Sequence, residues 1–225
     1  MSTFLPALPV AVPLVSAAFL AAVNQHIPRR AADLAAIATS VACVCTSLIL
    51  MFRSAHQPVV YWMGGWEPRG GAAIGISFSI DPLGAAAAAF ASFLALVAFV
   101  FSWHYFDSVG TLFHVLMLSF MAAMCGFSLT GDMFNLFVFF ELMSAAAFAL
   151  CGYKTEESGP IQGALNFAVT NTIGAFMALS GIGLLYGRTG ALNMAQIGKS
   201  LGQVHDGLVV AAFVLISCGF LVKAA

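Results

Sequence analysis

Charged side chains are scarce in this sequence. Asp, Glu, Lys and Arg make up 8% of its 225 residues, and hydrophobic residues make up 61%. A soluble domain carries about 25% charged residues, so the composition indicates an integral membrane protein. The formal net charge is −1 and no basic cluster occurs that could hold phosphates. Nucleic acid is therefore excluded as a partner.

Signatures of catalysis and of cofactor binding are also missing. GRTG (187–190) and MGGW (63–66) are too short for a phosphate-binding loop and lack its strand–helix context. No catalytic triad, metal-ligand spacing or ligand set for haem or iron–sulfur occurs. We therefore expect no cofactor and no enzyme active site within this chain. The cysteines, which lie within or beside apolar runs, are interpreted as small buried hydrophobic residues: Cys43, Cys45, Cys125, Cys151 and Cys218.

Long apolar runs predict an all-α, polytopic membrane fold with seven spanning helices and a single transmembrane domain over residues 1–225. Each run is near the ~20 residues that a bilayer core requires. The first 23 residues lack a basic n-region, so we expect a spanning helix there and not a cleaved signal peptide. The expected spans are 4–23, 31–52, 82–103, 111–129, 133–151, 161–185 and 207–225.

Two connections are long enough to have structure of their own. The alternating end of the 53–80 segment favours a short hairpin, and its aromatic residues suit a membrane interface. The 188–206 segment favours a short helix on the surface. Positive charges are nearly balanced between the two sides, and the short Arg29-Arg30 loop weakly favours its side as cytoplasmic.

Glu141 lies in the middle of an apolar run, DMFNLFVFFELMSAAAFAL (132–150). In the helix expected over 133–151, which is about 28 Å long, this residue falls at the bilayer midplane. An ionised carboxylate there costs on the order of 3 kcal/mol, which suits it to binding and releasing a proton. A proton or ion relay is the functional interpretation. The alternative is a protonated glutamate that only bonds a neighbouring helix.

Lys223, in ISCGFLVKAA (216–225), is a second charge in an apolar run. It could pair with Glu141 so that their separation switches a proton on and off. The alternative is a lysine that extends to a membrane interface, because the sequence ends two residues later.

Four further polar residues are candidate accessories to this pair. His114 could feed a water path, although its place near a helix start favours an interfacial histidine. Asp132 is expected to cap the helix at 133, and Ser144 lies one turn from Glu141, where it could bond the carboxyl group. Asn171 belongs to an Asn/Thr face that could line a hydrated path.

That same helix, 161–185, also carries a face of small residues. Thr170, Gly174 and Ala178 are spaced four residues apart, which predicts close packing against another helix.

The order of four stretches resembles the proton-translocating antiporter-like subunits. These are the large membrane chains of respiratory complex I, of membrane-bound hydrogenases and of Mrp-type multisubunit cation/proton antiporters. The resemblance covers residues 80–225, and LYGRTGALNMAQI looks most like the D-type branch of the Mrp antiporter chains. The stretches are FSIDPLGA, LTGDMFNLFVFFELMSAAAFALCGY, LNFAVTNTIGAFMALSGIGLLYGRTGALNMAQIG and GFLVKAA.

The resemblance implies roles for residues and partners. In this family a glutamate of the fifth helix and a lysine of the seventh act as an ion pair that controls lateral proton transfer. Glu141 matches the first and Lys223 the second. The implied partners are other membrane subunits of an antiporter or respiratory complex, together with protons, sodium and the lipid bilayer. The implied location is a bacterial inner membrane, with the N-terminus and the 53–80 segment on its outer side.

The sequence departs from the family in length. Family members have about fourteen spans in two inverted repeats, and half of such a repeat pair cannot complete a path across the membrane. We therefore expect this chain to be either a fragment or a piece completed by another polypeptide. A pumping subunit of an NADH:quinone oxidoreductase or hydrogenase complex, and a scaffold subunit with a degenerate ion site, remain alternatives to the antiporter subunit.

Overall fold

The protein is described here from a computed structural model, which describes residues 4–69, 73–105, 110–202 and 206–224. Within these residues, seven helices are long and apolar enough to cross a membrane. This confirms the multi-pass, all-α fold expected from the sequence. The spans comprise a short 3-10 helix, η1 (Leu5–Ala7), continuing into α1 (Leu8–Val23), then α2 (Arg29–His56), α3 (Pro82–Tyr105), α4 (Thr111–Leu129), α5 (Met133–Cys151), α6 (Ser158–Thr189) and α8 (Gly207–Ala224).

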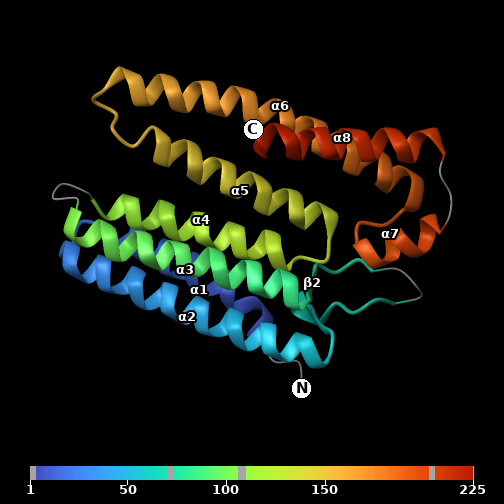
Figure 1. Cartoon of the computed structure of the whole chain (residues 1–225), viewed down its shortest axis with the longest axis horizontal. Coiled ribbons are helices and arrows are strands. Elements are labelled where there is room, and N and C mark those ends of the chain that lie inside the picture. The colour runs from blue at the N-terminus through green and yellow to red at the C-terminus, as the bar shows by residue number, and fades with distance from the viewer. Residues whose placement is uncertain (1–3, 70–72, 106–109, 203–205, 225) are drawn as a thin grey trace.

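The spanning helices lie side by side in one row of alternating direction (Figure 1). Helices α1 to α4 form one group, α5 packs on α4, and α6 follows with α8 against it. We call the end with the α1–α2, α3–α4 and α5–α6 connections the Arg29 end, and the opposite end the hairpin end. Helix α8 starts at the hairpin end and stops beside the middle of α6.

Both long connections are ordered at the hairpin end. Strand β1 (Val59–Trp62) pairs antiparallel with β2 (Ser77–Ile80), and a short 3-10 helix, η2 (Met63–Gly65), follows β1. The second connection contains α7 (Met194–Leu201). The expected hairpin and short helix are therefore confirmed.

The turn between α4 and α5 is held from two sides. Phe78 of β2 forms an isolated bridge with Thr130, and Asp132 forms one with Asn193. The backbone N–H of Gly131 donates to Ser77 at 2.9 Å. This turn fixes where α5 begins, and therefore the depth of every residue on that helix.

Two aspartates start helices as expected. The Asp81 carboxylate accepts from the Gly84 N–H at 2.5 Å at the start of α3, and Asp132 accepts from the Asn135 N–H at 2.8 Å at the start of α5. Both satisfy N–H groups that the first helical turn leaves open. The predicted cap at Asp132 is confirmed.

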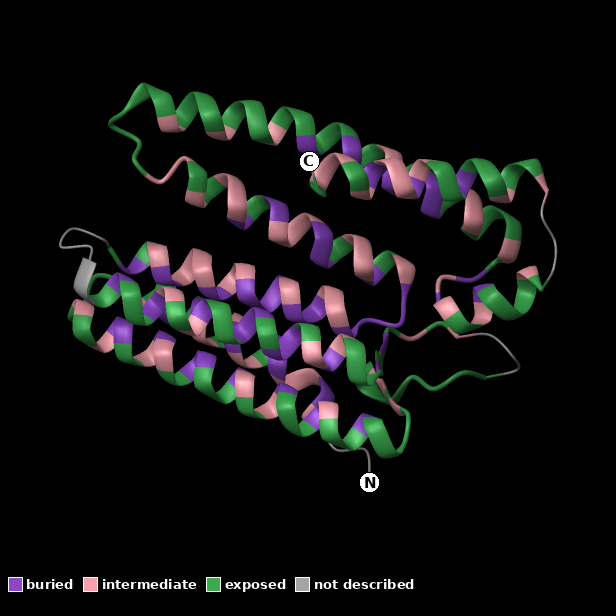
Figure 2. Ribbon diagram, in the orientation of Figure 1, coloured by how far each residue is buried: buried purple, intermediate pink, exposed green. Residues whose placement is uncertain are grey.

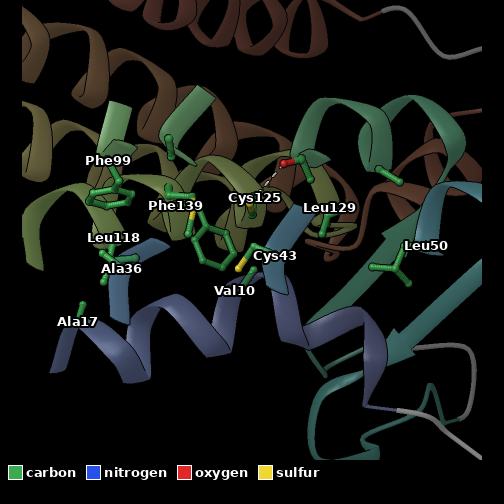
Figure 3. Close-up of a cluster of buried hydrophobic side chains, with 14 of the residues drawn as sticks. Val10, Ala17, Ala36, Cys43, Leu50, Phe99, Leu118, Cys125, Leu129 and Phe139 are labelled. Carbon is green, nitrogen blue, oxygen red and sulfur yellow. Dashed lines mark hydrogen bonds between the residues drawn. The ribbon is translucent and has the colours of Figure 1, made fainter. Parts of the chain in front are cut away.

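The core lies among α1 to α4 and the adjacent face of α5. Figure 2 shows buried residues on the facing sides of these helices, whereas α6 is mostly exposed except where α8 covers it. Phe139 of α5 and Cys43 of α2 reach into this core (Figure 3). A Cβ at Gly126 would lie 2.4 Å from the Phe139 ring, so only glycine lets α4 and α5 approach this closely.

The expectation for the cysteines is wrong for two of them. Cys43 and Cys125 are buried and Cys218 is half-buried, but Cys45 and Cys151 are exposed on the outside of the helices. An apolar run in a membrane helix also has a face that turns to lipid, and the thiol is apolar enough for that environment. An apolar sequence therefore did not identify which thiols are buried.

Candidate functional site

Glu141 lies near the middle of α5, as its position in the sequence predicted. Its side chain is half-buried, and its Oε1 atom is buried without a hydrogen-bond partner among the described residues. A buried polar atom without a partner costs about 1–3 kcal/mol, so such atoms are rare and need an explanation. A carboxyl oxygen that stays open for a proton or a moving cation is one.

Lys223 extends from α8 to the middle of α5. Its Nζ donates to the Phe140 backbone carbonyl and to Oγ of Ser144. The same ammonium group lies 3.5 Å from the centre of the Phe140 ring. The alternative of a lysine extending to a membrane interface is wrong here, because α8 stops beside the middle of α6 and its last residues lie deep within the span.

Ser144 contacts the lysine and not the glutamate. Its hydroxyl donates to the Phe140 carbonyl at 2.8 Å and accepts from Lys223. No Ser144–Glu141 hydrogen bond occurs among the described residues, so the expected bond is wrong. The physical reason is local, because a helical serine readily bonds the carbonyl four residues earlier and this fixes its rotamer.

Glu141 and Lys223 are near one another but are not in contact. The salt bridges between described residues do not include this pair. Their charges nevertheless interact, because each group acts electrostatically on the other. The structure therefore has the lysine bound beside the glutamate, one residue away along α5, with the carboxylate left open.

Helix α8 is held against α6 by small residues. A Cβ at Gly219 would lie 2.5 Å from the Gly174 carbonyl oxygen, and one at Gly174 would lie 2.9 Å from Val222. Gly174 and Ala178 are buried in this contact, as the small-residue pattern predicted, whereas Thr170 is exposed. The close approach places Lys223 at a fixed height in the membrane.

Asn171 lies one turn from Gly174 on the same helix. It is 3% exposed, and both atoms of its side-chain amide lack hydrogen-bond partners among the described residues. The neighbouring polar residues Asn166 and Thr172 are exposed. The expected hydrated face is therefore reduced to one buried amide at this level of α6.

The expectation that His114 is interfacial is wrong. It is 1% exposed, and its Nε2 lies 2.6 Å from Oδ1 of Asp33, an equally buried carboxylate of α2. Asp33 was not among the residues expected from the sequence. Two features of the sequence could have identified it, since it interrupts an apolar run and follows Arg29 by four residues, the spacing of a helical ion pair.

No metal centre accompanies these groups. Within the described ranges, no three His, Cys, Asp or Glu side chains gather where they could bind a metal ion. The arrangement around Glu141 and Lys223 therefore offers proton exchange between a carboxyl group and an ammonium group.

Comparison with known proteins identifies the part of the chain that carries both charges. Residues 130–225 match the family model described as "NADH:quinone oxidoreductase/Mrp antiporter, TM". This part of the chain belongs to that transmembrane family. Both Glu141 and Lys223 lie inside the matched region, whereas Asp33 and His114 lie outside it.

The similarity extends over nearly the whole chain. It is 33% identical over 228 residues to a probable K⁺/H⁺ antiporter chain of Rhizobium meliloti, the D-type subunit, covering 96% of this chain and 41% of that protein. It is also 33% identical over 237 residues to the N-type subunit of the NADH-quinone oxidoreductase of Desulforudis audaxviator, covering 100% and 45%. The chain therefore spans less than half the length of these curated relatives.

A solved structure has the same helical arrangement. A chain in the Mrp complex from Dietzia sp. DQ12-45-1b superimposes with a TM-score of 0.85 at 27% identity, covering 99% of this chain and 41% of that chain. The fold expected from the antiporter-like family is thereby confirmed.

Proposed function

We propose that this chain is an ion-translocating membrane subunit of a multisubunit complex, in which protons move through Glu141 and Lys223. One observation carries the proposal. The Lys223 ammonium group reaches α5 directly beside Glu141, while a carboxyl oxygen of Glu141 is buried without a partner among the described residues.

The pair would work by changing contacts. At about 4 Å and an effective dielectric constant near 20, opposite unit charges attract by ~4 kcal/mol. A salt bridge to Lys223 would therefore stabilise the Glu141 carboxylate and release its proton. When Lys223 is held by Phe140 and Ser144, as in the structure, that stabilisation weakens and Glu141 can accept a proton again.

The exchanged ion is a monovalent cation in this proposal. The resemblance to the Mrp branch favours sodium, and the R. meliloti relative is named for K⁺/H⁺ exchange. The complex would reside in a bacterial inner membrane with the Arg29 end in the cytoplasm, in agreement with the Arg29-Arg30 loop.

Glu141→Gln in the complete complex tests the relay. Glutamine keeps the size of the side chain but cannot ionise, so we expect proton or cation gradients to be nearly abolished while assembly is unchanged. Glu156→Gln, on the exposed α5–α6 connection, is the matched control and should transport normally. Wild-type transport by Glu141→Gln would exclude the relay.

A redox-driven pump is the second candidate. The D. audaxviator relative, as similar as the antiporter chain, is named as an oxidoreductase subunit. Electron transfer from NADH or hydrogen in the purified complex would favour the pump. Cation-driven proton exchange without any electron donor would favour the antiporter.

A scaffold subunit is the third candidate. It predicts that Glu141→Ala and Lys223→Ala change assembly of the complex and leave ion flux per assembled complex unaltered. The partnerless Glu141 oxygen argues against it, because a purely structural glutamate gains nothing from an open buried acceptor.

A further inference from the structure

A second buried pair of titratable groups lies away from Glu141 and Lys223. Asp33 is near the start of α2 and His114 near the start of α4, so both belong to the Arg29 end. Their side chains are only 3% and 2% exposed, and Nε2 and Oδ1 are 2.6 Å apart. The proposed relay uses neither residue.

The pair is built into its surroundings on every side. The His114 ring stacks on Phe99 of α3 with 5.9 Å between centroids and an interplanar angle of 5°. Phe113 meets the ring edge-on. Arg29 places Nε 3.8 Å from the second oxygen of Asp33 and donates through Nη2 to the Ser102 carbonyl. These contacts fix the ring and the carboxylate together.

One atom of the pair is left open. With Nε2 of His114 bound to Asp33, the other ring nitrogen, Nδ1, is buried and makes no hydrogen bond to any described residue. A ring fixed by three neighbours presents this nitrogen in one direction. Each protonation state of the imidazole either leaves Nδ1 with a free lone pair or gives it an N–H group.

We propose that Asp33 and His114 form a second proton-binding site, in which Nδ1 of His114 takes up the proton. The step is an N–H bond formed at Nδ1, which converts the imidazole to an imidazolium held by the Asp33 carboxylate. A proton fits better than sodium, because sodium requires several oxygen ligands and the pair offers only the carboxylate of Asp33.

The charges around the site permit both protonation states. Asp33 faces Arg29 and His114 together, so its negative charge offsets Arg29 when the ring is neutral and also supports the ring when it is charged. Helix α1 carries no ionisable side chain, nor does α3 between Pro82 and Trp103. Helix α5 contributes Glu141 and Cys151, and Tyr153 beyond it contacts the Phe113 ring.

The position of the site suggests its use. Helices α4 and α5 are antiparallel neighbours, and His114 lies roughly 10 Å along their axes from Glu141, toward the Arg29 end. The partly exposed Arg29 side chain links Asp33 to that surface. Resting on the proposed function, the site would hold a proton between the surface at the Arg29 end and Glu141.

Histidine nitrogen resonances of the whole complex test proton binding. With ¹⁵N-labelled histidine in this chain, the His114 ring should change from imidazole to imidazolium as the pH falls from 8 to 5. In Asp33→Asn, which keeps a hydrogen-bonding group but removes the charge, the ring should stay neutral. A His114 ring in the same state across this range in the wild type would overturn the proposal.

Assignment does not depend on one variant. If His114→Gln fails to assemble, the resonance is assigned by substituting His26, His56, His104 and His205 in turn. The role in transport is tested separately with His114→Gln against His56→Gln, an exposed histidine near the end of α2. A His114→Gln complex that assembles should lose most of its transport and the control none.

The two proposals fail independently. A titrating His114 with normal transport by His114→Gln would overturn its place on the proton path and leave Glu141 unaffected. Normal transport by Glu141→Gln would exclude the relay but would leave the proton binding at His114 to its own measurement.

Discussion

The ammonium group of Lys223 lies 3.5 Å from the centre of the Phe140 ring and also donates to the backbone carbonyl of that same residue. One residue of α5 therefore supplies two different contacts for a cation in the middle of the span. The next residue along the chain is Glu141. A lysine held this way is kept near the glutamate without being neutralised by it.

Removal of the Lys223 charge should stop transport. Lys223→Gln loses the ammonium group, and with it the only intramembrane cation that acts electrostatically on Glu141 among the described residues. We expect gradient formation in membrane vesicles to fall to the level of Glu141→Gln, with normal assembly. The control is Lys199→Gln on the exposed face of α7. Transport by Lys223→Gln at the control level would contradict the switch.

Removal of the aromatic ring should have a smaller effect. A cation–π contact contributes about 0.5–2 kcal/mol, so Phe140→Leu should change the initial transport rate by about 2- to 30-fold, since 1.4 kcal/mol corresponds to tenfold. The carbonyl contact remains in this variant. Phe176→Leu, at an exposed position on α6, controls for general loss of aromatic surface. Equal rates for the two variants would rule out a role for the ring.

Packing between α6 and α8 should tolerate no added methyl group. Gly219→Ala would place its Cβ 2.5 Å from the Gly174 carbonyl oxygen, and overpacking of this kind costs about 1–3 kcal/mol. Thermal unfolding in detergent should therefore occur at a lower temperature. Gly183→Ala on α6 meets nothing within 4 Å, and it should be neutral or stabilising. A normal midpoint for Gly219→Ala would show that the helices can separate.

The exposed pair at the hairpin end should respond to pH and salt. Arg188 donates to Asp206 at 2.7 Å and the Val209 N–H donates to the same carboxylate at 2.9 Å, and these bonds lower the pKa of Asp206 below its ordinary value. Any stabilisation is therefore present above about pH 4 and is lost as the pH falls through the lowered pKa.

Arg188→Gln should move the pKa of Asp206 back toward the ordinary value, measured by carboxyl NMR titration. The change in unfolding midpoint should be small, because the pair is exposed and screened by salt. A pKa of Asp206 unchanged by Arg188→Gln would show that the arginine does not act on this carboxylate.

The large features of the fold could be predicted because they follow from the bilayer. Seven apolar runs, a capping aspartate at Asp132 and a glutamate at the centre of its helix are local properties of the sequence. Close α6–α8 packing at Gly174 also followed from residue size and spacing. Each of these depends on one helix and the lipid around it.

Contacts between helices could not be predicted in the same way. The Asp33–His114 pair joins residues 81 positions apart, and nothing in the spacing along either helix specifies the other partner. Ser144 was assigned to Glu141 because it is near in sequence, yet it contacts Lys223 of α8. Similarly, the exposure of Cys45 depends on which face of α2 the other helices cover.

The contact of Gly174 with Gly219 makes α6 and α8 a single mechanical unit. With backbones this close, neither helix can slide or rotate past the other without a clash of main-chain atoms. Lys223 can therefore approach Glu141 only by swinging its flexible side chain, or by a rigid displacement of both helices relative to α5. Any ligand or partner that grips the outer face of α6 would then act on the position of Lys223 as well.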